Sequence, residues 1–172
     1  IATEEFADSA FNLDYSVKDI RDFADALKEK HRDNIEIDTL FNQNFTSENI
    51  GRIKQKLEQT KINDRVIISY SGHGLLDKDL NYYLSSYDVD FNNPQHGGIA
   101  YKELESLVKD IPARKKLLLI DACHSGEVDK DEQMSTAFVD TPSHLKLGNK
   151  GVVIANIDSS IGLENSFQLM QD

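Results

Sequence analysis

The sequence predicts an α/β fold, in which a mainly parallel sheet carries helices on both faces. Two observations predict it. Short runs of aliphatic and β-branched residues, typical of buried strands, alternate along the chain with segments whose apolar residues recur at helical spacing. The 172 residues are 39% hydrophobic and 28% charged, which is a globular composition and enough chain for one domain with its own core.

Amphipathic helices are predicted in three segments. They are residues 16–30, 46–60 and 99–110. The first begins with Ser16 and Asp19 at the spacing of a capping box, in which two residues cap the helix N-terminus reciprocally. Ser47 is the expected cap of the second helix, and Pro112 ends the third.

Strands are predicted in four segments, the last three of which run directly into loops. They are residues 34–40, 65–74, 115–126 and 150–160. The first alternates Ile35 and Ile37 with acids, as a half-buried strand does. The other three are continuous apolar runs, typical of parallel strands buried on both faces. Residues 77–98 are rich in turn signals, and the polar residues 127–149 are expected to form a mobile surface loop.

The charge balance narrows the choice of partners. The formal net charge is −11, which argues against nucleic acid or an anionic membrane surface as partner and suits cationic ligands. No apolar run is long enough to span a bilayer. A single cysteine cannot form an internal disulfide, so we expect a cytoplasmic protein.

Two motifs with chemical potential follow predicted strands. They are "SYSGHG" at residues 69–74 and "LLLIDACHSG" at residues 117–126. The ends of parallel strands share one sheet edge, so His73 and Cys123 can be neighbours there. A cysteine becomes a nucleophile when a base takes its proton. The competing interpretation is a small buried cysteine and an unrelated surface histidine.

Taken together, the two motifs resemble those of the caspase-like cysteine peptidases, and most of all the metacaspase branch. The spacing of 50 residues between His73 and Cys123 matches that of caspases. The resemblance also covers the first helix and residues 34–57. It implies the three-layer α/β sandwich of the caspase-hemoglobinase fold and a single peptidase domain over residues 1–172.

The resemblance implies a role for each site residue. Cys123 is the nucleophile and His73 the general base or acid, while the backbone amides of Gly74 and Cys123 stabilise the oxyanion. Asp121 and Ser71 line the pocket for the residue before the scissile bond and select Arg or Lys in a protein or peptide substrate. A buried or half-buried carboxylate binds a guanidinium strongly and repels an Asp side chain.

Two departures from the family pattern concern which parts of the peptidase domain this chain contains. The family opens with an apolar strand before the first helix, and none is evident before Phe11. The family also continues beyond the strand at residues 150–160 with further strands and helices. We therefore expect this chain to be a large-subunit-like portion, completed by a C-terminal small-subunit segment of the same precursor.

Calcium is a candidate activator, although the chemistry requires no cofactor. Some metacaspases need calcium, and the residues in suitable places here are Asp88, Asp90, Asp129 and Asp131. Calcium binds six to eight oxygen ligands, which a cluster of loop aspartates can supply. The competing interpretation is that these acids belong to solvated loops.

Two other functions stay open at this point. The first is a caspase-fold interaction module, or a gated enzyme that is inactive without a partner segment or signal. The second is a related peptidase of different specificity, of the legumain, clostripain or separase kind. Substrate profiling separates the second from a metacaspase.

Overall fold

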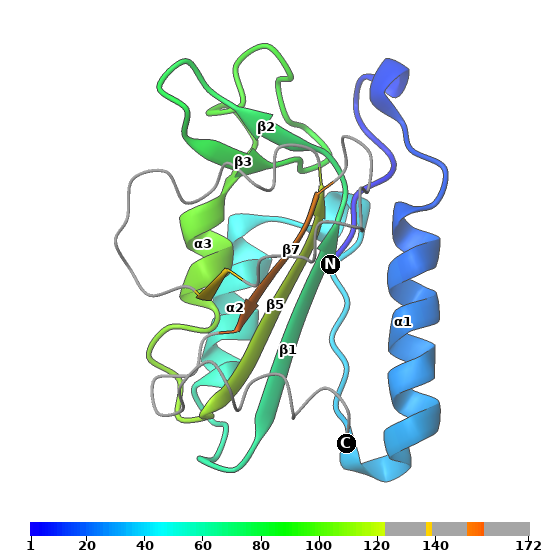
Figure 1. Cartoon of the computed structure of the whole chain (residues 1–172). Helices are drawn as coiled ribbons and strands as arrows, with labels where there is room; N and C mark the ends of the chain where they lie inside the picture. The colour runs from blue at the N-terminus through cyan, green and yellow to red at the C-terminus, as the bar shows by residue number, and fades with distance from the viewer. Residues whose placement is uncertain (123–136, 139–150, 157–172) are drawn as a thin grey trace.

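The main sheet confirms the α/β class. The computed structural model describes residues 1–122, 137–138 and 151–156 (Figure 1). The sheet has the order β1-β5-β7-β6, and its strands are β1 (Arg65–Ser71), β5 (Lys115–Ala122), β6 (Ala137–Phe138) and β7 (Gly151–Asn156). As predicted, β1 and β5 are parallel, with a register that runs from Arg65 opposite Lys115 to Ser71 opposite Asp121.

The direction of β7 differs from the prediction. It pairs antiparallel to β5, with Gly151 opposite Ala122, and β6 pairs antiparallel to β7. A continuous apolar run fits a central strand in either direction, so the sequence pattern could not set it. Most of residues 127–149, expected to be a mobile loop, lie outside the described residues.

Helices cover both faces of the sheet, as predicted. Figure 1 shows α1 (Ser16–His31) on one side, with α2 (Ser47–Leu57) and α3 (Tyr101–Ser106) on the other. Short 3₁₀ helices occur at Ser9–Phe11, Arg32–Asn34 and Asn42–Asn44. Thr46 caps α2 by accepting a hydrogen bond from the amide of Asn49, so the expected cap Ser47 is instead the first helical residue. Within the described residues, no helix is long and apolar enough to cross a membrane.

The larger core lies between the sheet and the helices α2 and α3. Alternate residues of β1, ending with the fully buried Tyr70, face this core together with Leu118 and Ile120 of β5. Ile50 of α2 and Leu104 of α3 pack against them. A smaller cluster of Ala2, Val17 and Ile20 lies under α1 on the opposite face. The separation of the two clusters is what a layered α/β fold requires.

The first residues of the chain pair with two segments through isolated bridges, and one predicted strand is not formed. Ala2 forms parallel bridges to both Phe41 and Ser71, so residues 1–3 lie between β1 and residues 40–42. No strand was expected before Phe11, and none is assigned there. Residues 34–40, predicted as a strand, are not assigned as one, because the bridge between Ala2 and Phe41 is isolated.

A second, antiparallel sheet lies next to the region expected to be loop, and only β3 falls within residues 77–98. It has the order β2-β3-β4, and its strands are β2 (Gly74–Leu76), β3 (Tyr82–Leu84) and β4 (Ile99–Ala100). The β2–β3 turn is organised by Asp77, whose carboxylate accepts hydrogen bonds from Asn81, from the amide of Asp79 and from Gln95. These bonds, led by that from the Asn81 side chain, lower the pKa of Asp77 to about 2.

Candidate active site

His73 follows β1 on a backbone held by buried hydroxyl groups. The amide of His73 donates to Ser85 Oγ over 3.1 Å, and the hydroxyl of Tyr70 donates to the carbonyl of His73 over 3.0 Å. The amide of Ser85 donates to the same carbonyl over 3.0 Å. Tyr70 and Ser85 are fully buried, and burial raises the pKa of the Tyr70 phenol. Both polar groups of the His73 backbone are therefore bonded.

Gly72 is needed because the Tyr70 phenol approaches it closely. A Cβ at position 72 would lie 2.5 Å from the Tyr70 hydroxyl oxygen and 2.9 Å from the ring carbon that carries it. The amide of Gly72 also donates to the carbonyl of Asp121 over 3.2 Å, which joins the ends of β1 and β5. The glycine thus permits the hydrogen bonds that hold the neighbouring His73.

The imidazole of His73 is oriented by a backbone carbonyl that the sequence did not indicate. Nε2 of His73 lies 2.8 Å from the carbonyl oxygen of Phe11. A carbonyl oxygen can only accept, so Nε2 carries the proton in this bond. In the neutral imidazole, Nδ1 is then the nitrogen with a free lone pair. A carbonyl of a short 3₁₀ helix has no sequence signature, which is why Phe11 was missed.

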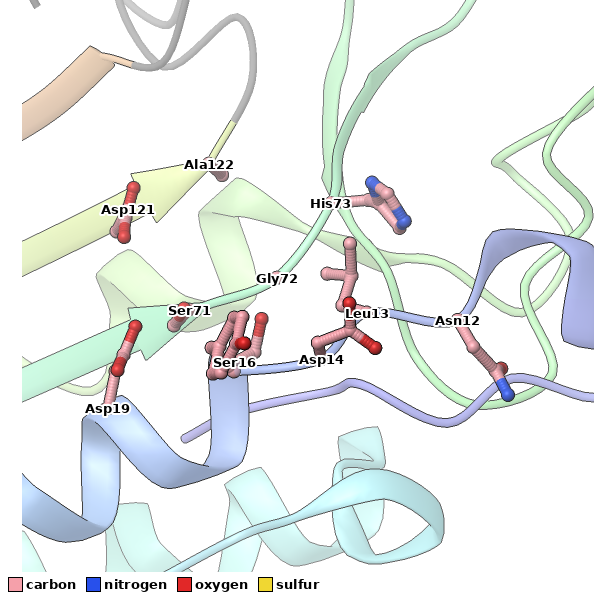
Figure 2. Close-up of a pocket in the computed structure, with 11 residues that line it drawn as sticks. Asn12, Leu13, Asp14, Ser16, Asp19, Ser71, Gly72, His73, Asp121 and Ala122 are labelled. Carbon is pink, nitrogen blue, oxygen red and sulfur yellow. The ribbon is translucent and has the colours of Figure 1, made fainter.

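The parallel register brings the ends of β1 and β5 to one edge. Ser71 lies opposite Asp121, and Figure 2 shows His73 on the chain leaving β1 and Ala122 at the end of β5. The predicted nucleophile Cys123 is the next residue in the sequence after Ala122, but it lies outside the described residues. The structure therefore places His73 at the edge where the described part of β5 ends.

A cavity of about 290 Å³ opens beside His73. It is lined by Asn12, Leu13, Asp14, Tyr15, Ser16, Asp19, Ser71, Gly72, His73, Asp121 and Ala122. Two residues predicted to line the substrate pocket, Asp121 and Ser71, are therefore brought together. Figure 2 shows Asp121 on β5, Ser71 on β1 and Asp19 on α1 around one space. Asp14 and Asp19 were not predicted from the sequence to belong to this site.

Three carboxylates that line the cavity form no ion pair with any described residue. Asp14, Asp19 and Asp121 all line it and are all exposed. Within the described residues, none of the three forms an ion pair or a side-chain hydrogen bond. Asp121 is exposed near the end of β5. Ser71, by contrast, is buried.

Asp19 is free to face the cavity because another residue caps α1. The amide of Val17 donates to Glu4 Oε2 over 2.9 Å, and the N-cap residue Tyr15 makes no side-chain capping bond. The predicted capping box of Ser16 and Asp19 is therefore wrong. Its spacing did place both residues at the first turn of α1, and both line the cavity.

The amide of Gly74 points away from its strand partner. Gly74 lies opposite Leu84, and the bond from the Ser85 amide to the His73 carbonyl makes this a non-hydrogen-bonded pair. The Gly74 N–H is therefore directed to the outer side of β2, which is the edge strand of its sheet. An outward amide beside His73 is a donor that can bind a developing oxyanion.

The described part of the predicted calcium site does not by itself fit the ion. The Asp88 carboxylate accepts a bond from the Ser86 hydroxyl, and that of Asp90 accepts bonds from the following amides. Among the described residues, no group of three or more His, Cys, Asp or Glu side chains is arranged to hold a metal. Asp129 and Asp131 lie outside the described residues.

The chain is similar to known proteins over most of its length. A family model described as a caspase domain matches residues 1–166. Metacaspase-1 of Meyerozyma guilliermondii is 39% identical over 90 residues, a match that covers 47% of this chain and 22% of that relative. No solved structure matches the chain significantly.

Proposed function

The chain belongs to the caspase domain family, and from that premise we propose that it is a cysteine endopeptidase that cleaves peptide bonds after Arg or Lys. The observation that carries the proposal is the acidic cavity, formed by Asp14, Asp19 and Asp121, which opens beside His73. A general base and a cation-binding pocket at one sheet edge are the two parts that such a peptidase needs.

The cavity supports selection of a basic side chain. Its carboxylates have no cation among the described residues, so a substrate guanidinium or ammonium would form charge-assisted hydrogen bonds without displacing an existing pair. An Asp side chain in the same space would meet three negative charges. Tyr15, which also lines the cavity and is 66% exposed, offers a ring face to a planar guanidinium.

The chemistry follows from the orientation of His73. In the proposal, the imidazole takes the proton of the Cys123 thiol, and Sγ attacks the carbonyl carbon of the scissile bond. The C–N bond then breaks as the imidazolium gives that proton to the leaving amine. Water then attacks the thioester, giving a proton to the imidazole and releasing the thiolate from the acyl carbon. Because Nε2 is bound to the Phe11 carbonyl, Nδ1 is the nitrogen that exchanges these protons.

The oxyanion of each tetrahedral intermediate requires donors at the same edge. The outward amide of Gly74 is one, and the amide of Cys123 is proposed as the second. The bonds that hold the His73 backbone also hold this amide, since Gly74 is the next residue. The described structure supports the base and the first donor, and the family membership supports the nucleophile.

Fluorogenic peptides that differ only at the residue before the scissile bond test the proposal. We expect the intact protein to cleave after Arg and Lys and not after Asp or Asn, and Cys123→Ala and His73→Ala each to lose at least about 10³-fold in kcat. The assay is run with and without calcium. Cleavage after Asp would contradict the pocket assignment. Silence on every peptide in both conditions would favour a gated enzyme or an interaction module.

A further inference from the structure

Phenylalanine side chains surround the imidazole of His73. The centroid of the His73 ring lies 5.3 Å from that of Phe6 and 5.4 Å from that of Phe91. The Phe91 contact is edge-to-face, with an interplanar angle of 84°. Such edge-to-face contacts are favourable and constrain the plane of the imidazole ring. The imidazole therefore has side-chain packing in addition to its hydrogen bond.

Phe91 also contacts Phe11, whose carbonyl accepts the hydrogen bond from the imidazole. Its ring stacks on Phe11 with a centroid separation of 3.7 Å and an angle of 8°, and it meets Phe6 edge-on at 5.3 Å. Among the described residues, it is thus in ring contact with Phe6, Phe11 and His73 together. Phe11 is 37% exposed and its amide donates to the carbonyl of Asp8, so the stacking of Phe91 is a second restraint on its position.

The turn that carries Phe91 is itself well restrained. Asp90 accepts hydrogen bonds from the amides of Asn92 and Asn93, and its own amide donates to the carbonyl of His96. The carboxylate of the residue before Phe91 therefore binds the amides of the two residues that follow it. This arrangement gives Asp90 a structural role, and it presents the Phe91 ring to the site from a segment distant in sequence from Phe11.

We propose that Phe91 is a positioning residue for His73, one that holds the imidazole plane and the Phe11 carbonyl in register so that Nδ1 faces the reacting atoms. This inference rests on the proposed peptidase function for its kinetic consequence only. Without the Phe91 ring, the imidazole can turn about its Cβ–Cγ bond, and Nε2 loses its acceptor. A misplaced base costs rate and not substrate binding, because the acidic cavity lies apart from Phe91.

The kinetic test compares Phe91→Ala, Phe91→Leu and Phe91→Tyr in the intact protein. For the Arg peptide, we expect kcat to fall roughly 10- to 100-fold in the Ala and Leu variants while KM changes less than about 2-fold. Phe91→Tyr keeps the ring and should restore kcat. The Leu side chain keeps most of the apolar volume of Phe91. If Phe91→Ala fails to fold, Phe91→Leu can therefore still be compared with wild type. Equal kcat in wild type and Phe91→Leu would overturn the proposal.

A spectroscopic test needs no activity. Imidazole ¹⁵N shifts of His73, assigned by comparison with His73→Gln, report which nitrogen carries the proton at about pH 8.5, where an ordinary imidazole is neutral. We expect the Nε2–H tautomer in wild type and Phe91→Tyr, and a mixture of tautomers in Phe91→Leu. A single unchanged tautomer in Phe91→Leu would overturn the positioning role. If the ¹⁵N shifts are as expected but no peptide is cleaved, only the proposed peptidase function is contradicted.

Discussion

The two sides of the sheet edge differ in how fully their polar groups are bonded. On the His73 side, the backbone amide and carbonyl are both bonded, through the fully buried Tyr70 and Ser85. On the cavity side, Asp19 and Asp121 are exposed and form no ion pair within the described residues. Groups that move protons must be oriented before the substrate arrives, whereas groups that bind charge gain most by staying unpaired until it does.

This difference separates folding from recognition. Substitutions in the acidic cavity should change which substrate is bound and leave the free energy of unfolding unchanged. Substitutions around Tyr70 and Ser85 should lower the free energy of unfolding together with the rate. A cavity variant that lowers the free energy of unfolding, or a variant at Tyr70 or Ser85 that changes substrate preference, would contradict this separation.

Among the variants that test this comparison, the largest effect is expected from the double variant Asp19→Asn/Asp121→Asn. Hydrogen bonds to charged groups contribute about 1.5–3 kcal/mol each, so we expect kcat/KM for the Arg peptide to fall at least roughly 10²-fold. The melting temperature should stay the same, because neither carboxylate has a partner in the described residues. Asp25→Asn is the matched control, since it removes an exposed charge from α1 away from the cavity.

Two outcomes of that experiment would contradict the proposed roles of Asp19 and Asp121. An unchanged kcat/KM would show that the acidic cavity is not the substrate pocket. A lower melting temperature would show that the carboxylates stabilise the fold, and the proposed division between the two sides would fail.

A smaller effect, on stability, is expected from Ser85→Ala. The variant removes the acceptor of the His73 amide and a partner of the buried Tyr70 hydroxyl. Buried polar groups left without a partner cost about 1–3 kcal/mol, which should appear as a lower denaturant midpoint in equilibrium unfolding. Ser9→Ala is the control, because Ser9 is exposed in a 3₁₀ helix. Equal midpoints for the two variants would contradict a structural role for the Ser85 hydroxyl.

The smallest effect concerns acid and is confined to the β2–β3 turn. The pKa of Asp77 is about 2 in the folded protein, against an ordinary value of 3.8. The ionised carboxylate therefore stabilises the fold above about pH 4, and this stabilisation disappears as the pH falls toward 2. We expect the melting temperature of wild type to exceed that of Asp77→Asn at pH 7, and the gap to narrow steadily below pH 4. A difference in melting temperature that stays constant below pH 4 would show that the ionised Asp77 carboxylate is not its cause.

The parts of the site that lie on regular elements could be predicted from the sequence. Apolar runs located β1 and β5, and the rule that parallel strands end at one edge brought His73 near Asp121. The predicted helices also match α1 and α2 closely. These predictions succeed because they depend on periodicity and chain direction alone.

The remaining parts depend on tertiary contacts that no local pattern records. Asp19 faces the cavity only because Glu4, fifteen positions earlier, caps α1 in its place. The acceptor for the His73 imidazole is a backbone carbonyl, and its neighbour Phe91 lies in a segment that looked like loop. The direction of β7 was equally hidden, since its apolar sequence suits either orientation.

The contact between Gly72 and the Tyr70 hydroxyl makes the effects of two substitutions interdependent. Alanine at 72 collides with the phenol oxygen, whereas a phenylalanine at 70 removes that oxygen and leaves room for the ring to shift. Gly72→Ala should therefore be harmful in the presence of Tyr70 and better tolerated beside Tyr70→Phe, a case of epistasis between neighbouring positions. During evolution, Gly72 could therefore be replaced only after the Tyr70 hydroxyl had been lost.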